Sequence, residues 1–277
     1  YTNTAIGTDA LFNNTTGSGN TATGYEALKN TVSNGSNTAF GYRTLTNTVN
    51  NSNSAFGNKA LYSNTGGAEN SAFGKGALQN NTTSYGSSAF GSMALYNSTA
   101  TNTCAFGNYA LYSNSTGTTN SAFGYATLHN NTTGTGNTAT GYKALRYTTT
   151  GHYNTATGNS ALFTNTTGSY NVAYGYKALN QNTTGGYNVA IGMSSGYNST
   201  GDNNTFLGSN TDVYPTTADL WNSTALGYGA KITASNQIAL GTSTETVEVP
   251  GDLHVSGQLS KGSGTFKIDH PLPEKEN

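Results

Sequence analysis

Residues 137–158 read NTATGYKALRYTTTGHYNTATG, so the motif Asn-Thr-Ala-x-Gly occurs twice in this short stretch. The two alanines of the motif, Ala139 and Ala156, are seventeen positions apart. With small changes before the alanine, the motif recurs twelve times at steps of sixteen or seventeen positions. The marker alanines are Ala5, Ala22, Ala39, Ala55, Ala72, Ala89, Ala105, Ala122, Ala139, Ala156, Ala173 and Ala190. A fixed period of this kind predicts a repeat architecture.

Two further positions of the repeat are nearly constant. Glycine follows every marker by two residues, and leucine follows it by six in eleven of the twelve copies, the exception being Gly196. A period of this length is too short for a helix pair but suits one coil of a β-solenoid, with two short strands and two turns. Turn segments such as Asn14–Gly17 supply the Asn and Gly that turns need, and no proline precedes Pro215.

The sequence therefore predicts an all-β protein, a parallel β-solenoid or β-roll of about 12 coils. We expect the solenoid to occupy residues 1–208 and shorter repeats to occupy 209–246. In the second segment Asn222–Gly227 recurs as Asn236–Gly241, a step of fourteen positions. Residues 247–277 are expected to form a short β-rich shaft and tail, because apolar and polar residues alternate around glycines over 247–259.

Stacked coils place equivalent residues one above another, so each position of the repeat becomes a column. One residue after the marker we expect an aromatic stack of Phe40, Phe56, Phe73, Phe90, Phe106 and Phe123. Two residues before the marker we expect a ladder of amides that includes Asn20, Asn37, Asn53, Asn70 and Asn120. Each coil offers only Ala, Phe or Thr, Ala and Leu for burial, so the core is thin and association with further chains would complete it.

Charged residues are scarce in this sequence. Charged residues make up 8% of the chain and the net charge is −1, whereas Asn and Thr together supply almost a third of all residues. A charged column would repel itself at coil spacing, whereas amides and hydroxyls bond to their own copies. The balance argues against a nucleic-acid footprint. No apolar run has the length of a membrane span, so we expect no membrane insertion by this segment.

The motifs at Asn222–Gly227 and Asn236–Gly241 resemble the head repeats of YadA-like trimeric autotransporter adhesins, and the longer copies resemble an expanded version of the same coil. The resemblance covers most of the chain before the C-terminal tail. It implies a left-handed parallel β-roll, a homotrimer, an extracellular location and binding to surfaces or matrix without catalysis.

The C-terminal part departs from that family, because neither a long heptad coiled coil nor a membrane anchor is visible. Residues 247–259 resemble instead the β-rich shaft of phage and viral fibre proteins. Residues 264–272 look like the segment that precedes an assembly chaperone in some such fibres. The trimeric fibre is thus favoured over the membrane-anchored autotransporter.

The search for catalytic and metal-binding groups leads to no enzyme and no cofactor. His129 and His152 occupy surface positions of the repeat, and Asp269 and His270 are adjacent on an expected strand and so face opposite ways. Asp202, Asn203, Asn204 and Asp212 offer side-chain oxygens of the type that calcium binds, but turn capping is the favoured role. The single cysteine, Cys104, is expected to be an isolated thiol.

The best binding candidates are tyrosines that recur in three columns, because rows of Tyr flanked by Asn and Thr suit stacking on sugar rings. These are Tyr25, Tyr42, Tyr125, Tyr142 and Tyr176 three residues after the marker, Tyr62, Tyr96 and Tyr112 seven after it, and Tyr153, Tyr170 and Tyr187 three before it. Covering of ladder edges or filling of grooves between chains is the favoured alternative. An ice-binding face is not favoured, since no flat Thr-x-Thr face is evident.

We therefore expect a structural and adhesive extracellular fibre protein, with itself as partner and cell-surface glycan or matrix as a further partner. The alternatives are a phage tail fibre that binds host glycan and a self-assembling filament without a dedicated ligand. A polysaccharide depolymerase would need a cluster of carboxylates that the sequence does not show.

Overall fold

The computed structural model describes residues 2–215, 219–250, 254 and 256. The chain divides into two units, residues 1–245 and 246–277. The first unit contains every strand that the structure describes, and no helix is present in the described residues.

Seventeen short strands follow one another along the first unit. They are β1 (Thr4–Ile6), β2 (Thr21–Thr23), β3 (Thr38–Phe40), β4 (Ser54–Phe56), β5 (Ser71–Phe73), β6 (Ser88–Phe90), β7 (Cys104–Phe106), β8 (Ser121–Phe123), β9 (Thr138–Thr140), β10 (Thr155–Thr157), β11 (Val172–Tyr174), β12 (Val189–Ile191), β13 (Thr205–Leu207), β14 (Asp212–Val213), β15 (Thr224–Leu226), β16 (Lys231–Ile232) and β17 (Ile238–Leu240).

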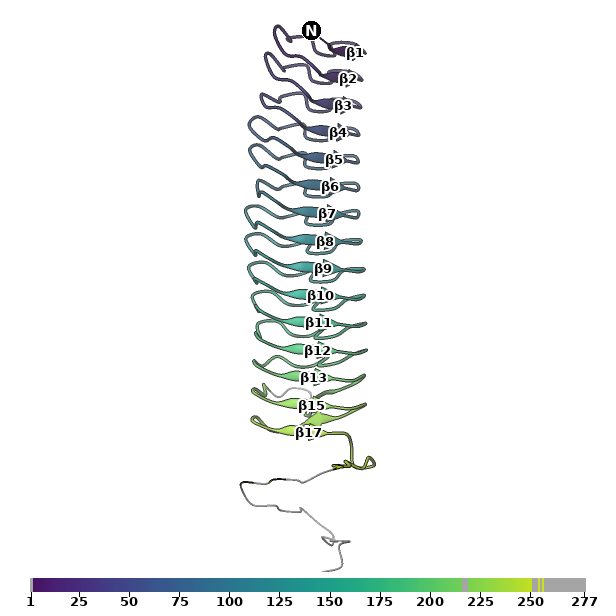
Figure 1. Ribbon diagram of the computed structural model, residues 1–277, viewed down its shortest axis with the longest axis vertical. Coiled ribbons are helices and arrows are strands. Elements are labelled where there is room, and N and C mark those ends of the chain that lie inside the picture. Colours follow the sequence, from purple (N-terminus) through teal and green to yellow (C-terminus); the bar gives the residue numbers. More distant parts are fainter. Residues whose placement is uncertain (1, 216–218, 251–253, 255, 257–277) are drawn as a thin grey trace, which may run out of the picture. The chain divides into compact units, whose positions relative to one another are not determined.

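The strands form a parallel β-solenoid, as the period predicted. Fifteen of them pair in chain order into one parallel sheet, and β14 pairs with β16 in a second sheet of two strands. Each marker alanine lies opposite the next, for example Ala139 opposite Ala156. Figure 1 shows the coils stacked one on another from β1 to β17. The sheet includes the coil of β13, which the alanine marker misses because Phe206 stands at the marker position.

One expectation about the coil was wrong: each regular coil has one strand, not two. The wall opposite the strand is built from turns in which every repeat leucine, from Leu11 to Leu179, has a φ between 49° and 54°. These turns still bond from coil to coil, since the Leu78 amide donates to the Ala94 carbonyl at 3.0 Å. A second strand appears only with β14 and β16, where the repeat changes.

The glycine that follows each strand is required by its conformation and its surroundings. In the twelve marked copies its φ lies between 125° and 145°, a region open only to glycine. A Cβ on Gly91 would lie 2.6 Å from the Gly107 carbonyl carbon and oxygen of the next coil. Neighbouring coils therefore approach at this point as closely as their backbones allow.

The core is a narrow column of small side chains. In the coil of β6 the fully buried apolar residues are Ala89, Ala94 and Leu95, and other coils repeat this set. The expectation that phenylalanine adds to the core was wrong: the strand alternates, so Ala89 faces inward while Phe90 faces outward. In the coils that contain the repeat leucine, the inward position of the strand holds alanine and the phenylalanine beside it lies on the outer face.

The six outward phenylalanines stack along the outer face of the sheet. The ring centroids of Phe56, Phe73, Phe90 and Phe106 are 4.7, 4.7 and 4.6 Å apart in succession. Phe40 and Phe123 continue the stack at 6.1 and 5.2 Å, and both are exposed. The three middle spacings match that of paired strands, about 4.8 Å, and the planes of successive rings differ by 19° or less. We call this row the phenylalanine stripe.

The asparagines before the strand are buried and bond along the solenoid axis. The Asn154 backbone amide donates to Asn137 Oδ1 at 2.9 Å, and Asn154 Nδ2 donates to the Gly168 carbonyl at 2.8 Å. The same backbone bond joins Asn20 to Asn37, Asn37 to Asn53, Asn53 to Asn70 and Asn120 to Asn137. Direct bonds between side-chain amides are fewer, so each asparagine acts mainly on backbone groups of adjacent coils.

The missing leucine at Gly196 is replaced by a ring from the next coil. A Cβ on Gly196 would lie 2.7 Å from Phe206 Cδ2 and 3.0 Å from Leu179 Cδ2. Phe206 is fully buried and is the largest of the buried side chains. The two departures from the repeat, glycine for leucine and phenylalanine for alanine, therefore compensate each other.

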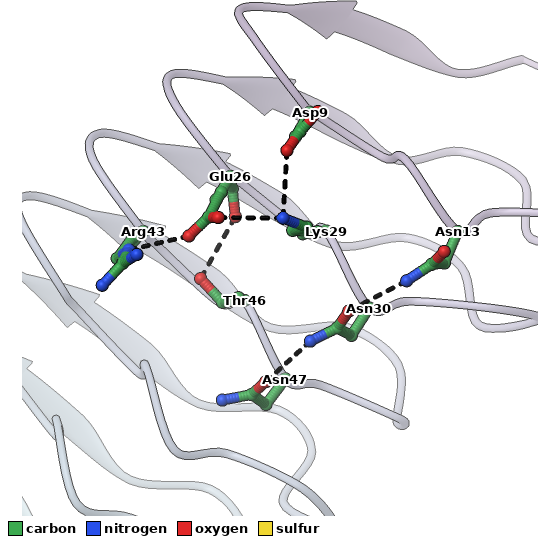
Figure 2. Close-up of polar contacts among 8 residues, drawn as sticks. All are labelled: Asp9, Asn13, Glu26, Lys29, Asn30, Arg43, Thr46 and Asn47. Carbon is green, nitrogen blue, oxygen red and sulfur yellow. Dashed lines mark hydrogen bonds and ion pairs between the residues drawn. The ribbon is translucent and has the colours of Figure 1, made fainter.

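Asp9, Glu26 and Arg43 of the first coils lie in one column, and Lys29 from a neighbouring column bridges the two carboxylates. Lys29 Nζ lies 3.0 Å from Asp9 Oδ2 and 2.8 Å from Glu26 Oε1, and Arg43 Nε lies 2.7 Å from Glu26 Oε2 (Figure 2). Beside this network, hydrogen bonds of 2.9 Å join three surface amides into a ladder, those of the exposed Asn13 and Asn30 and the half-buried Asn47 (Figure 2). Charges are tolerated here because each carboxylate contacts a cation, so the repulsion between Asp9 and Glu26 is offset.

The regular coils end with β17. Residues 242–250 contain no strand, and the Thr242 amide and hydroxyl both bond to Glu245 Oε2. Most of the expected shaft, and all of the expected chaperone-preceding segment at 264–272, lie outside the described residues.

Candidate functional site

The predicted tyrosines flank the sheet at the opposite ends of its strands. Tyr153, Tyr170 and Tyr187 come two residues before their strands begin, whereas the other eight follow the strands. The structure therefore does not bring all eleven together. We call the first set the leading tyrosines and the second the trailing tyrosines.

The leading tyrosines form one continuous exposed stack. The ring centroids of Tyr153 and Tyr170 are 5.3 Å apart, and those of Tyr170 and Tyr187 are 4.9 Å apart. Their exposed fractions are 55%, 47% and 60%. All three have φ near +60°, the conformation that glycine, serine and asparagine adopt in the same column of other coils. The backbone therefore holds these rings on the outside of the coil.

An open groove of about 370 Å³ lies beside the end of this stack. It is lined by hydroxyl, amide and carboxylate groups next to two of the rings, namely Thr167, Ser169, Tyr170, Thr184, Gly186, Tyr187, Asp202 and Asn203. Asp202 Oδ1 accepts a hydrogen bond from the Gly186 amide at 2.7 Å. Aromatic faces next to several hydrogen-bonding groups suit a sugar, whose ring has apolar faces and hydroxyl edges.

The trailing tyrosines occur as shorter stacks in two neighbouring columns. Tyr25 pairs with Tyr42 at 5.3 Å, Tyr125 with Tyr142 at 5.4 Å, and Tyr96 with Tyr112 at 5.3 Å. The Tyr112 ring continues onto His129 at 5.2 Å. Tyr62 and Tyr176 each lie under a lysine ammonium, that of Lys59 at 6.0 Å and that of Lys177 at 5.2 Å.

Tyr109 and Tyr197 belong to the same surface but were not predicted. Tyr109 lies between the two trailing columns, 5.8 Å from Tyr112 and 6.2 Å from Tyr125. Tyr197 occupies the position seven after the marker, and Lys177 Nζ lies 6.0 Å from its ring. The position of Tyr197 in the repeat was a sufficient signal. The contacts of Tyr109 depend on how two columns converge, which spacing alone does not tell.

The candidate calcium ligands do not converge on one point. Asp202 lies in the groove beside the leading tyrosines, and Asn204 is buried in the asparagine ladder, where its Oδ1 accepts from the Ser223 amide. Asp212 lines a different groove and accepts two bonds from Asn198, at 3.0 and 2.7 Å. Burial raises the pKa of the Asp212 carboxyl despite these two bonds.

His129, His152 and Cys104 are each the one residue of their type at their position of the repeat. His152 Nδ1 accepts a bond from the Thr135 amide at 3.1 Å. Cys104 is a free, half-buried thiol in β7, between Ser88 and Ser121 of the neighbouring strands. Among the described residues, no three or more His, Cys, Asp or Glu side chains gather in an arrangement able to hold a metal ion. Within the same part of the chain, no helix has the length and apolarity to cross a bilayer.

Comparison with known proteins adds no assignment to this geometry. No protein-family model matches the chain, and no curated protein is significantly similar to it.

Proposed function

We propose that this protein is part of an extracellular fibre that attaches to surfaces through a repetitive β-solenoid. Its attachment relies on many weak contacts along the coils, so avidity takes the place of one tight pocket. The proposal includes a homotrimer as the working form and no catalytic step.

The observation that carries this proposal is the exposed stack of the leading tyrosines. Three rings repeat at 5.3 and 4.9 Å in similar surroundings, beside a groove of hydroxyl and amide groups. In the single chain these rings are about half exposed, so they are not part of its core. Regularly spaced rings of this kind suit a ligand that is itself repetitive, such as a cell-surface glycan.

The phenylalanine stripe is an argument for the proposed association of chains. Outward rings stack over six successive coils, while the core of each coil has only two alanines and a leucine. Packing of this stripe against other copies removes its exposed apolar area from water, at roughly 25 cal/mol per Å². Three copies around one axis would each bury the same face.

Two measurements on the intact protein test the proposal. Binding to a glycan array and to whole cells is compared before and after Tyr153, Tyr170 and Tyr187 are all replaced by Asn. Asparagine is the matched replacement, since Asn102, Asn203 and Asn222 occupy the same column with φ of 54°, 58° and 54°. Loss of attachment is expected, and unchanged attachment would contradict the role of the stack.

The mass of the assembly separates the trimer from a growing filament. Chemical cross-linking followed by mass measurement is expected to stop at three chains of 28.6 kDa each. A ladder of products that continues beyond three would contradict the closed trimer.

A further inference from the structure

The basic residues of the regular coils gather on one edge of the solenoid. In residues 1–201 all seven lie between the third and seventh positions after their markers. They are Lys29, Arg43, Lys59, Lys75, Lys143, Arg146 and Lys177. The trailing tyrosines share this edge, and cations lie over tyrosine rings at 4.5–6.0 Å. Asp9 and Glu26 neutralise only its first coils.

The edge is hollowed where the regular repeat ends. An open groove of about 310 Å³ is lined there by aromatic, cationic and amide side chains. Its lining includes Tyr176, Lys177, Tyr197, Asn198, Asp212 and Lys231. Tyr176 is 47% exposed, so much of its ring faces the groove or solvent. We call this the two-lysine groove.

Charge in the two-lysine groove is not balanced from within. The Asp212 carboxylate is buried and accepts two bonds from Asn198, and Lys231 Nζ lies 4.0 Å from its Oδ2. Lys231 Nζ donates to the Asn210 carbonyl at 2.9 Å, which leaves further N–H donors on this ammonium. Lys177 forms no ion pair among the described residues. Two ammonium groups against one carboxylate leave a net charge of +1.

We propose that the two-lysine groove binds a carboxylated sugar, a hexuronate unit of an acidic polysaccharide. The sugar carboxylate pairs with the ammonium groups of Lys177 and Lys231, and the apolar face of the pyranose packs on the exposed part of Tyr176. Ser194 and Asn210, which also line the groove, offer hydrogen bonds to hydroxyls. A single negative charge matches the groove better than a phosphate does, because Asp212 would repel a second charge. This proposal names a ligand class for the adhesive function and rests on it.

Binding is tested by titration calorimetry of the intact protein with three hexuronate oligomers, an oligogalacturonate, an oligomannuronate and a hyaluronate tetrasaccharide. At least one is expected to bind tenfold or more tightly than its own methyl ester, which has the same shape without the charge. Binding is also expected to weaken with added salt. Equal binding of acid and ester, or no binding of any oligomer, would overturn the proposal. Oligodeoxythymidylate serves as a nucleic-acid polyanion for comparison, and tighter binding of it than of the hexuronate oligomers would overturn the proposal as well.

Variants locate the site. Lys177→Gln and Lys231→Gln are each expected to weaken binding of the hexuronate at least tenfold. Lys177→Arg and Lys231→Arg keep the positive charge and are expected to retain much of the binding. Lys143→Gln is the matched control, since Lys143 Nζ lies 4.5 Å from the Tyr142 ring but outside the groove. Thermal unfolding of each variant shows that it is folded. Equal losses in all three glutamine variants would indicate a diffuse charge effect and contradict a site at the groove.

Whole-cell attachment, measured with the same proteins, separates this proposal from the proposed function. If no hexuronate binds but the protein still attaches to cells, the groove assignment fails and the adhesive function stands. If hexuronates bind but no surface retains the protein, the adhesive function fails.

Discussion

At the scale of single residues, the glycine after each strand decides how closely coils stack. Gly91 has a φ of 139°, and the backbone of Gly107 leaves no space for a Cβ. We predict that Gly91→Ala lowers the free energy of unfolding by about 2 kcal/mol or more, since strained backbone alone costs about 1–3 kcal/mol. Urea unfolding followed by circular dichroism measures the change.

Gly66→Ala is the matched control for this prediction. Gly66 does not have a positive φ, and its added Cβ would meet only the Thr83 methyl, at an ordinary 3.5 Å, and the Thr82 carbonyl oxygen at 3.8 Å. Its stability is expected to stay within about 0.5 kcal/mol of the parent, as for surface changes in general. Equal destabilisation by both substitutions would show that the conformation after the strand is not the cause.

Glu26 makes stability depend on acid pH. A hydrogen bond from Lys29, followed by contacts with Arg43, lowers the pKa of the Glu26 carboxyl. Because its folded pKa is lower than its unfolded value, Glu26 stabilises the fold above about pH 4.3 and loses this contribution as the pH falls through the folded pKa. Glu26→Gln is therefore expected to lower Tm at pH 7 and to have little effect near pH 2.

Glu69→Gln is the control for the pH series. Glu69 is exposed and forms no ion pair among the described residues. Its replacement is expected to leave Tm nearly unchanged at both pH values. A difference between Glu26→Gln and the parent that stayed constant with pH would contradict the electrostatic explanation.

Single positions also show where sequence reasoning succeeds and fails. The hydrogen bonds of Asn20 and its equivalents along the axis follow from a column of identical residues that can bond to their own copies. The outward position of Phe90 was missed because hydrophobicity favours burying phenylalanine before alanine. Strand alternation alone allows either the alanine or the phenylalanine to face the core. The narrow width of the coil favours alanine, and residue types do not reveal that width.

At the scale of one coil, Gly196 and Phe206 form a compensating pair. We predict that Phe206→Ala destabilises the protein by about 3–5 kcal/mol, as expected for a buried ring. Gly196→Leu alone is also destabilising, because its Cβ would lie 2.7 Å from the Phe206 ring. The double variant recreates the leucine and alanine of the other coils, whose leucines have φ near the 60° of Gly196.

The double variant is therefore expected to be more stable than either single variant, with a coupling of several kcal/mol in a double-mutant cycle. Denaturant unfolding of all four proteins measures it. Additive losses would mean that the Phe206 ring does not fill the place of the missing leucine.

The shape of a coil was only partly predictable. The period, the strand position and the glycine column follow from the recurring motif. The absence of a second strand in regular coils does not, because it depends on leucines that adopt positive φ, a conformation that long side chains rarely take. Hydrogen bonds between coils, such as Leu95 to Ala110, support this conformation only after neighbours have stacked.

At the scale of the whole molecule, we expect the phenylalanine stripe to form the contact between chains in the proposed trimer. Replacing Phe73 and Phe90 by Thr, the residue at 23 and 140 in the same column, is expected to leave each coil folded and to weaken the trimer. Sedimentation equilibrium should then show dissociation at concentrations where the parent remains trimeric. Val32→Thr, which removes an exposed apolar side chain outside the stripe, should have no such effect.

Attachment by many weak contacts is tested most directly by removing the leading tyrosines one at a time. The dissociation rate of the intact protein from a glycan-coated surface is measured for variants with one, two and three of Tyr153, Tyr170 and Tyr187 replaced by Asn. We predict that the rate rises stepwise with each ring removed. A rate that never changes, or one that reaches its maximum with the first ring removed, would contradict attachment by repeated contacts.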